Sequence, residues 1–205
     1  MSDQTVAVTG VASEELDPDY ATLTVSVSAG GQTASEVHDR ASERRAGVVD
    51  ALASHGISRE SITTTEFTVS EATEFLEEPA DDVEATVELQ FRCTPVELDR
   101  LGSVVVDAGG VIQSVELGID EDRRAEIDSQ LLEAAVEHAR RRATAIASAH
   151  GATLGDVQSF DASTTGTFDS IVDDALAASS GADLSTGPVE LSVNVDTVYE
   201  LQARE

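Results

Sequence analysis

The sequence predicts an α+β protein in which helices pack on a mostly antiparallel sheet, in the order β-β-α-β-β-α-β-α-β-β. Three observations support this fold class. Apolar and polar residues alternate in several segments, as in half-buried strands. Other segments carry apolar residues at helical spacing and end at glycine. A strand–helix–strand run occurs twice in succession, which is typical of a split βαβ arrangement. With 205 residues, 40% of them apolar, we expect one domain over residues 1–205.

The first half of the chain contains the first of these runs. Thr33 or Ser35 can cap its helix, and Glu36 follows Thr33 at the spacing of a capping box. The following strand is rich in threonine, which favours extended backbone. The expected elements are strands at residues 6–11 and 20–29, a helix ending at Gly56, a strand at 62–70, an acidic hairpin loop at 71–82 and a strand at 83–93.

The second half is dominated by one long amphipathic helix. Four alanines recur every four residues along it, and such a smooth stripe lets a sheet or a second helix approach closely. The polar stretch after it predicts a long mobile loop, because Ser, Thr, Gly and Asp dominate there. The expected elements are a helix from Pro95 to Gly109, a strand at 111–119, a helix at 124–150 with Ala135, Ala139, Ala143 and Ala147, a strand at 157–163, the mobile loop at 164–187 and a strand at 189–201.

Charge is the strongest compositional signal. The chain has 40 Asp and Glu against 12 basic residues, for a formal net charge of −28, and all 12 bases are Arg. In dilute buffer such a surface repels itself, whereas at roughly 1 M salt the screening length falls to about 3 Å. The acids are spread along the whole chain rather than gathered in one block. We therefore interpret the composition as halophilic, adapted to a salt-rich cytoplasm, rather than as an acidic interaction tail.

The same charge argues against nucleic acid as a partner, because binding phosphate requires clustered cations. The one basic run, Arg140-Arg141-Arg142, lies in the second half of the long helix, where cations favour the macrodipole. No segment reaches the roughly 18 apolar residues of a membrane span, so we expect no membrane insertion. The N-terminus shows no secretory signal, and Cys93 is the only cysteine, so we expect a cytoplasmic protein.

The candidate catalytic residues are few. The four histidines are His38, His55, His138 and His150, and no two of them are four residues apart on one helix. His55 and His150 each precede a glycine, where an imidazole can bond the last carbonyls of a helix. Cys93 could act as a nucleophile if a histidine approached it, but a small buried apolar role is commoner.

The acidic clusters are the candidate metal ligands. Asp120-Glu121-Asp122 and the group Asp169, Asp173 and Asp174 could hold a hard cation weakly. Their order does not match the twelve-residue calcium loop, so we interpret them as solvated acids. No lysine exists to complete a phosphate-binding loop at either glycine pair. The sequence therefore assigns no catalytic, cofactor-binding or metal-binding residue, and it implies no cofactor.

Several short motifs, in this order and spacing, resemble the SIMPL-domain family, named after a signalling protein that binds a pelle-like kinase. They are Val6-Ala7-Val8-Thr9-Gly10 followed by Pro18-Asp19, the series from Leu52 through Gly56-Ile57 to Ile62-Thr63-Thr64, Arg140-Arg141-Arg142-Ala143, Ala147 through Gly151 to Leu154-Gly155-Asp156-Val157, and Val198-Tyr199-Glu200-Leu201. The resemblance covers nearly the whole chain. It implies links to stress protection, signalling adaptors and ring-like assemblies, without an agreed catalytic residue.

Three functional hypotheses follow. The first is a non-enzymatic assembly or interaction protein, a homo-oligomer that also contacts other proteins, joined through strands or through the alanine stripe. The second is an enzyme whose polar residues converge without a sequence motif. The third is a carrier of a small ligand with a pocket under the 164–187 loop. The absence of a catalytic motif favours the first hypothesis.

Overall fold

The computed structural model describes residues 4–71, 83–167 and 187–203. In chain order it contains β1 (Gln4–Leu16), β2 (Tyr20–Gly31), α1 (Ala34–Ser54), η1 (Arg59–Ser61), β3 (Thr63–Glu71), β4 (Val83–Cys93), η2 (Pro95–Glu97), α2 (Leu98–Asp107), β5 (Val111–Gly118), α3 (Glu121–Ala149), β6 (Ala152–Thr167) and β7 (Val189–Ala203). The expected order of strands and α-helices is confirmed. All five strand pairings are antiparallel, which confirms the α+β class.

The strands are divided between two sheets, a detail that the alternation patterns do not contain. The first and last strands pair with each other over their full length in a three-stranded sheet of order β1-β7-β6. The other four strands form a sheet of order β3-β4-β2-β5. The chain correspondingly divides into two compact units, one built from β1, α3, β6 and β7 and the other from residues 18–118.

The unit of residues 18–118 is the expected split βαβ arrangement. Its two successive runs are β2-α1-β3 and β4-α2-β5, and the strands interleave in one sheet. The hydroxyl of Thr33 caps α1 by accepting from the Glu36 amide, and Gly56 takes a positive φ of 99° after its end. Apolar residues of both helices are buried, so the core lies on the helix-bearing side of the sheet: Val37, Ala41, Val48 and Leu52 from α1, and Leu98, Leu101 and Val105 from α2.

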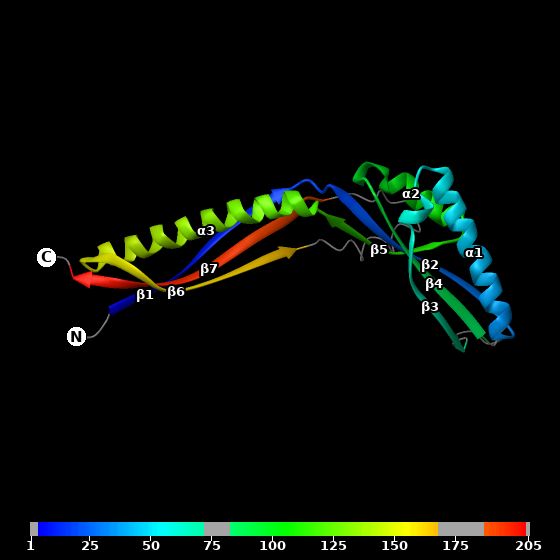
Figure 1. Ribbon diagram of the computed structural model, residues 1–205, viewed down its shortest axis with the longest axis horizontal. Helices are drawn as coiled ribbons and strands as arrows, with labels where there is room; N and C mark the ends of the chain where they lie inside the picture. The colour runs from blue at the N-terminus through cyan, green and yellow to red at the C-terminus, as the bar shows by residue number, and fades with distance from the viewer. Residues whose placement is uncertain (1–3, 72–82, 168–186, 204–205) are drawn as a thin grey trace. The chain divides into compact units, whose positions relative to one another are not determined.

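The second unit places α3 along one face of its sheet (Figure 1). The alanine stripe faces that sheet and is at most 1% exposed. Ala139 and Ala143 pack with Val6, Val8 and Tyr199. The stripe therefore forms the core of this unit, and the hypothesis that it is a contact surface between copies is wrong.

Two loop boundaries also differ from the sequence pattern. β6 continues to Thr167 and β3 continues to Glu71, so residues 164–167 and Glu71 belong to strands. Threonine favours extended backbone, and β7 supplies a partner for each added residue of β6 down to Glu190. The remainder of the two expected loops, residues 168–186 and 72–82, lies outside the described residues, so their expected mobility is untested.

Candidate functional site

Two of the four histidines have the structural role that their positions predict. Nδ1 of His55 lies 2.9 Å from the carbonyl oxygen of Ala51, four residues back on α1. Nδ1 of His150 lies 3.0 Å from the carbonyl oxygen of Ile146 on α3. Both imidazoles bond a carbonyl of the last helical turn, and the carbonyl of Ile146 also accepts from the backbone amide of His150. This confirms the interpretation of His55 and His150 as caps.

The other two histidines contact different elements. His38 on α1 lies 3.3 Å from a carboxylate oxygen of Asp39, and its ring centroid is 5.2 Å from that of Phe67 on β3. His138 on α3 reaches the backbone of Val11 on β1. None of these contacts joins a histidine to Cys93 or to a second histidine. The described histidines therefore do not form a nucleophile–base pair.

Cys93 is buried at the end of β4. Burial, reinforced by the nearby Glu97 carboxylate and partly opposed by Arg100, raises the pKa of the Cys93 thiol from 9.0 to about 11. At neutral pH the group is therefore a thiol rather than the reactive thiolate. This agrees with the small apolar role and not with the nucleophilic one.

The acidic candidates are divided between a helix start and an undescribed segment. Asp120 is the N-cap of α3, and Glu121 and Asp122 occupy its first turn, where carboxylates favour the positive end of the macrodipole. Asp169, Asp173 and Asp174 lie outside the described residues. Within the residues that the structure describes, no three His, Cys, Asp or Glu side chains gather as metal ligands would.

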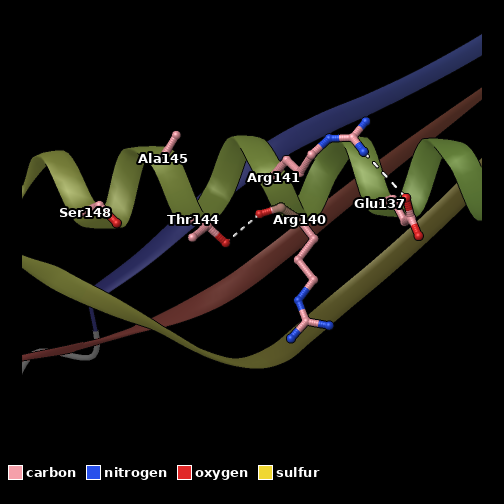
Figure 2. Close-up of a pocket in the computed structure, with 6 residues that line it drawn as sticks. All are labelled: Glu137, Arg140, Arg141, Thr144, Ala145 and Ser148. Carbon is pink, nitrogen blue, oxygen red and sulfur yellow. Dashed lines mark hydrogen bonds and ion pairs between the residues drawn. The ribbon is translucent and has the colours of Figure 1, made fainter.

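One surface hollow lies along α3. All six residues that line it come from that helix: Glu137, Arg140, Arg141, Thr144, Ala145 and Ser148. Figure 2 shows Arg141 directed toward Glu137, 3.5 Å away, and Arg140 pointing away from both. A hollow lined by a single helix face has no opposing wall, so it offers a ligand little enclosure.

A second hollow is lined by all three strands of the three-stranded sheet and by Arg142 of α3. Asp161 of β6 lies opposite Asp196 of β7, whose carboxylate accepts a 2.6 Å hydrogen bond from the hydroxyl of Thr9 on β1. Two carboxylates on an open sheet face are too few for a calcium site, which takes six to eight oxygen ligands. The geometry does not favour a metal or a small ligand there.

The edges of the three-stranded sheet differ from one another, and this difference is the most distinctive feature of the described residues. Along the edge strand β1, Arg142 donates to the carbonyl oxygen of Thr9 at 2.5 Å. Nδ1 of His138 lies 3.1 Å from the amide nitrogen and 2.9 Å from the carbonyl oxygen of Val11, accepting or donating according to its tautomer. Side chains of α3 thus occupy outward backbone groups of β1 at Thr9 and Val11, and we call Thr9–Val11 the covered edge.

The opposite edge strand, β6, is open. Among the described residues, no side chain or backbone group from outside its own sheet bonds the backbone of β6. Because α3 packs mainly on β1 and β7, the side chains of Val157 and Phe160 remain 53% and 52% exposed. Register shifts interrupt the pairing with β7 before residue 159, whereas residues 159–167 pair without interruption. We call residues 159–167 the open edge.

Arginine covers a strand edge in the other unit as well. β5 pairs with β2 only as far as Ser26, which leaves the last part of β2 without a neighbour on that side. Arg44 and Arg40 of α1 donate there to the carbonyl oxygens of Ser28 and Gly30, at 2.6 and 2.8 Å. Edge protection by helix-borne arginine therefore recurs, and β6 lacks it among the described residues.

No sequence motif predicts the covered edge. His138 and Val11 are 127 residues apart, and Arg142 and Thr9 are 133 apart. The only signal was the position of both side chains on the same flank of the long helix, four residues apart. The open edge could not be expected either, because residues 164–167 resemble a loop in composition.

The chain has an α+β fold with two antiparallel sheets, and the comparison with protein families identifies its class. A family model described as SIMPL, protein of unknown function (DUF541), matches residues 6–199. The match spans both units, and the chain belongs to this family. No protein with a curated description matches the chain significantly. None of the described helices is long and apolar enough to cross a membrane.

Proposed function

We propose that this chain is a non-enzymatic SIMPL-family protein that assembles with further copies of itself in a salt-rich cytoplasm, and that the open edge of β6 is its contact surface. The observation that carries the proposal is the contrast between the covered edge and the open edge. An edge strand presents a row of unpaired N–H and C=O groups, which is a template for pairing with another chain. Side chains of α3 cover this template at Thr9 and Val11 of β1, whereas no described side chain from outside the sheet covers it on β6.

The composition of β6 supports the same role. Monomeric proteins protect edge strands with lysine, proline, inward-pointing charges or short length. β6 has 16 residues, contains no lysine, arginine or proline, and carries only Asp156 and Asp161 as charges. The half-exposed Val157 and Phe160 add apolar area that a neighbouring copy would remove from water.

High salt allows two chains that each carry a net charge of −28 to associate. Two such chains repel each other in dilute buffer, whereas at roughly 1 M salt the screening length of about 3 Å removes most of that repulsion. Main-chain hydrogen bonds and apolar contacts between strands survive such screening because they are short-ranged. Assembly is therefore favoured in the conditions to which the composition is suited. A stress-related role, which the resemblance implies, would act through this assembly.

The placement of the candidate catalytic groups supports a non-enzymatic role. His55 and His150 are occupied as helix caps, and His138 is occupied at the covered edge. Burial holds the pKa of Cys93 at about 11, far from the range of an activated thiol. The residues that line the two hollows include no histidine or cysteine.

The mass of the particle in molar KCl, measured by light scattering, tests the proposal. One chain has a mass of 21.4 kDa. We expect a mass of at least two chains that rises with protein concentration, because the contact is between identical copies. A mass of one chain at every concentration would reject assembly and leave an enzyme or a ligand carrier as the surviving hypotheses.

A further inference from the structure

The open edge has a natural centre. It begins where the two register shifts of β6 end and continues to the last residue of the strand, so it spans residues 159–167. Its midpoint is Ser163, which lies opposite Asn194 of β7 on the sheet face away from α3. A strand pairing with a copy of itself about a two-fold axis uses the longest uninterrupted segment if the axis passes through this midpoint.

We propose that two copies of the chain join by antiparallel pairing of β6 with β6, with the two Ser163 residues opposite each other. This inference rests on the proposed assembly and names its partner and its register. Each copy then contributes its nine-residue open edge to a continuous six-stranded sheet. The resulting cross-strand pairs are Ser163 with Ser163, Ala162 with Thr164, Asp161 with Thr165, Phe160 with Gly166 and Ser159 with Thr167.

The pair of Phe160 with Gly166 already has a counterpart inside the molecule. Tyr20 on β2 lies directly opposite Gly118 on β5. The tyrosine ring covers the glycine so closely that a Cβ on Gly118 would lie 2.3 Å from the ring. An aromatic side chain over a cross-strand glycine compensates for the missing side chain of the glycine. Phe160 opposite Gly166 repeats this pair across the two-fold axis and covers the half-exposed phenylalanine.

The pair of Asp161 with Thr165 also has a counterpart. Thr9 on β1 lies opposite Asp196 on β7, and its hydroxyl donates to the aspartate carboxylate at 2.6 Å. Asp161 opposite Thr165 repeats this arrangement twice, once on each side of the axis. The only carboxylates in the open edge thus face hydroxyl donors rather than each other, and opposed like charges, which destabilise strand pairs, are avoided.

Charge favours a second β6 over β3 as the partner. β3, one of the two edge strands of the four-stranded sheet, carries Glu66 and Glu71 within nine residues. Each β6 brings one carboxylate into its nine-residue open edge. A two-fold axis perpendicular to the sheet also keeps both copies of α3 on the same face. The exposed strip of Val157 and Phe160 then lies between two helices instead of beside one.

The register is tested by cysteine crosslinking of the full chain in molar KCl with diamide as the oxidant. In the proposed register the two Ser163→Cys residues have Cα atoms about 4.5 or 5.5 Å apart, which is within disulfide range. The matched control is Ser159→Cys on the same strand. In the proposed register, the two Ser159→Cys residues are eight residues apart along the paired strands. At roughly 3.4 Å per residue, the distance between them is far beyond disulfide range.

We expect a disulfide-linked dimer for Ser163→Cys at least about tenfold more abundant than for Ser159→Cys, with unchanged circular dichroism for both. The native Cys93 is buried, so we expect no crosslink in the unmodified chain, which serves as an internal check. Equal crosslinking of the two variants would overturn this register. If the unmodified protein still forms a particle of two or more chains, the proposed assembly remains intact. An unmodified particle of one chain overturns both.

Discussion

At the scale of single residues, the contact between Gly10 and α3 decides whether the three-stranded sheet can hold its helix. A Cβ on Gly10 would lie 2.0 Å from the carbonyl oxygen of Ala135 and 2.8 Å from the Cβ of Ala139. At Gly10 the backbone of β1 therefore lies directly against α3. The alanine stripe follows from this close approach, because any larger residue on the helix would push the strand away.

Gly10→Ala is expected to destabilise the protein by about 1–3 kcal/mol or more, because the added methyl group overpacks against backbone that cannot rotate away. Gly47→Ala is the matched control. Gly47 lies inside α1, where an added Cβ would meet no atom within 4 Å. The same change there should stabilise by about 0.5–1 kcal/mol through helix propensity. Urea unfolding in molar KCl measures both, and a Gly10→Ala protein as stable as the unmodified one contradicts the close approach.

Residue roles could be predicted where they depend on neighbours in the chain. The caps at His55 and His150 follow from a histidine beside a glycine, and the roles of Thr33 and Glu36 follow from their spacing. The role of His138 could not be predicted. Its partner on β1 is brought close only by the pairing of the first and last strands, and local sequence carries no record of that pairing.

At the scale of elements, the molecule uses arginine to close strand edges. The guanidinium group presents five donors in a fixed fork, and its long stem reaches from a helix to the outward carbonyls of a strand. Arg142 serves β1, whereas Arg40 and Arg44 serve β2. A surface without lysine therefore still contains the cations that its exposed strands need.

Arg142→Ala is expected to open the covered edge. Removing the donor to Thr9 should lower stability by about 0.5–1.5 kcal/mol and should also let a second strand add to β1, so the particle mass should rise above that of the unmodified protein. Arg141→Ala is the control, because that side chain contacts only the exposed Glu137. Thermal unfolding measures the change in stability, and light scattering measures the change in particle mass. Identical behaviour of both variants would show that Arg142 does not protect the edge.

Element order could be predicted well because each strand and helix carries its own periodicity. The residues at which strands end were harder to predict. Residues 164–167 have a loop-like composition and form part of β6 only because β7 pairs with them. The division into two sheets was also beyond the pattern, since alternation tells which face of a strand is buried and not which strand is its neighbour.

At the scale of the whole molecule, we expect the net charge of −28 to make the stability of the fold depend on salt. We expect circular dichroism to show loss of structure when KCl falls from molar to tens of millimolar, because self-repulsion grows as screening weakens. The melting temperature should fall over the same range. A melting temperature independent of salt would mean that the ion pairs and the core outweigh the repulsion, and it would contradict the salt adaptation.

The central claim is that copies meet at the open edge of β6 while the edge of β1 stays covered. Backbone amide hydrogen exchange in molar KCl, compared at low and high protein concentration, tests it most directly. Amides that point outward from an open edge exchange quickly until a partner strand bonds them. The account predicts that alternate amides of residues 159–167 become protected as concentration rises, while the Val11 amide is unchanged. Protection gained at Val11, or at no strand edge, would contradict it.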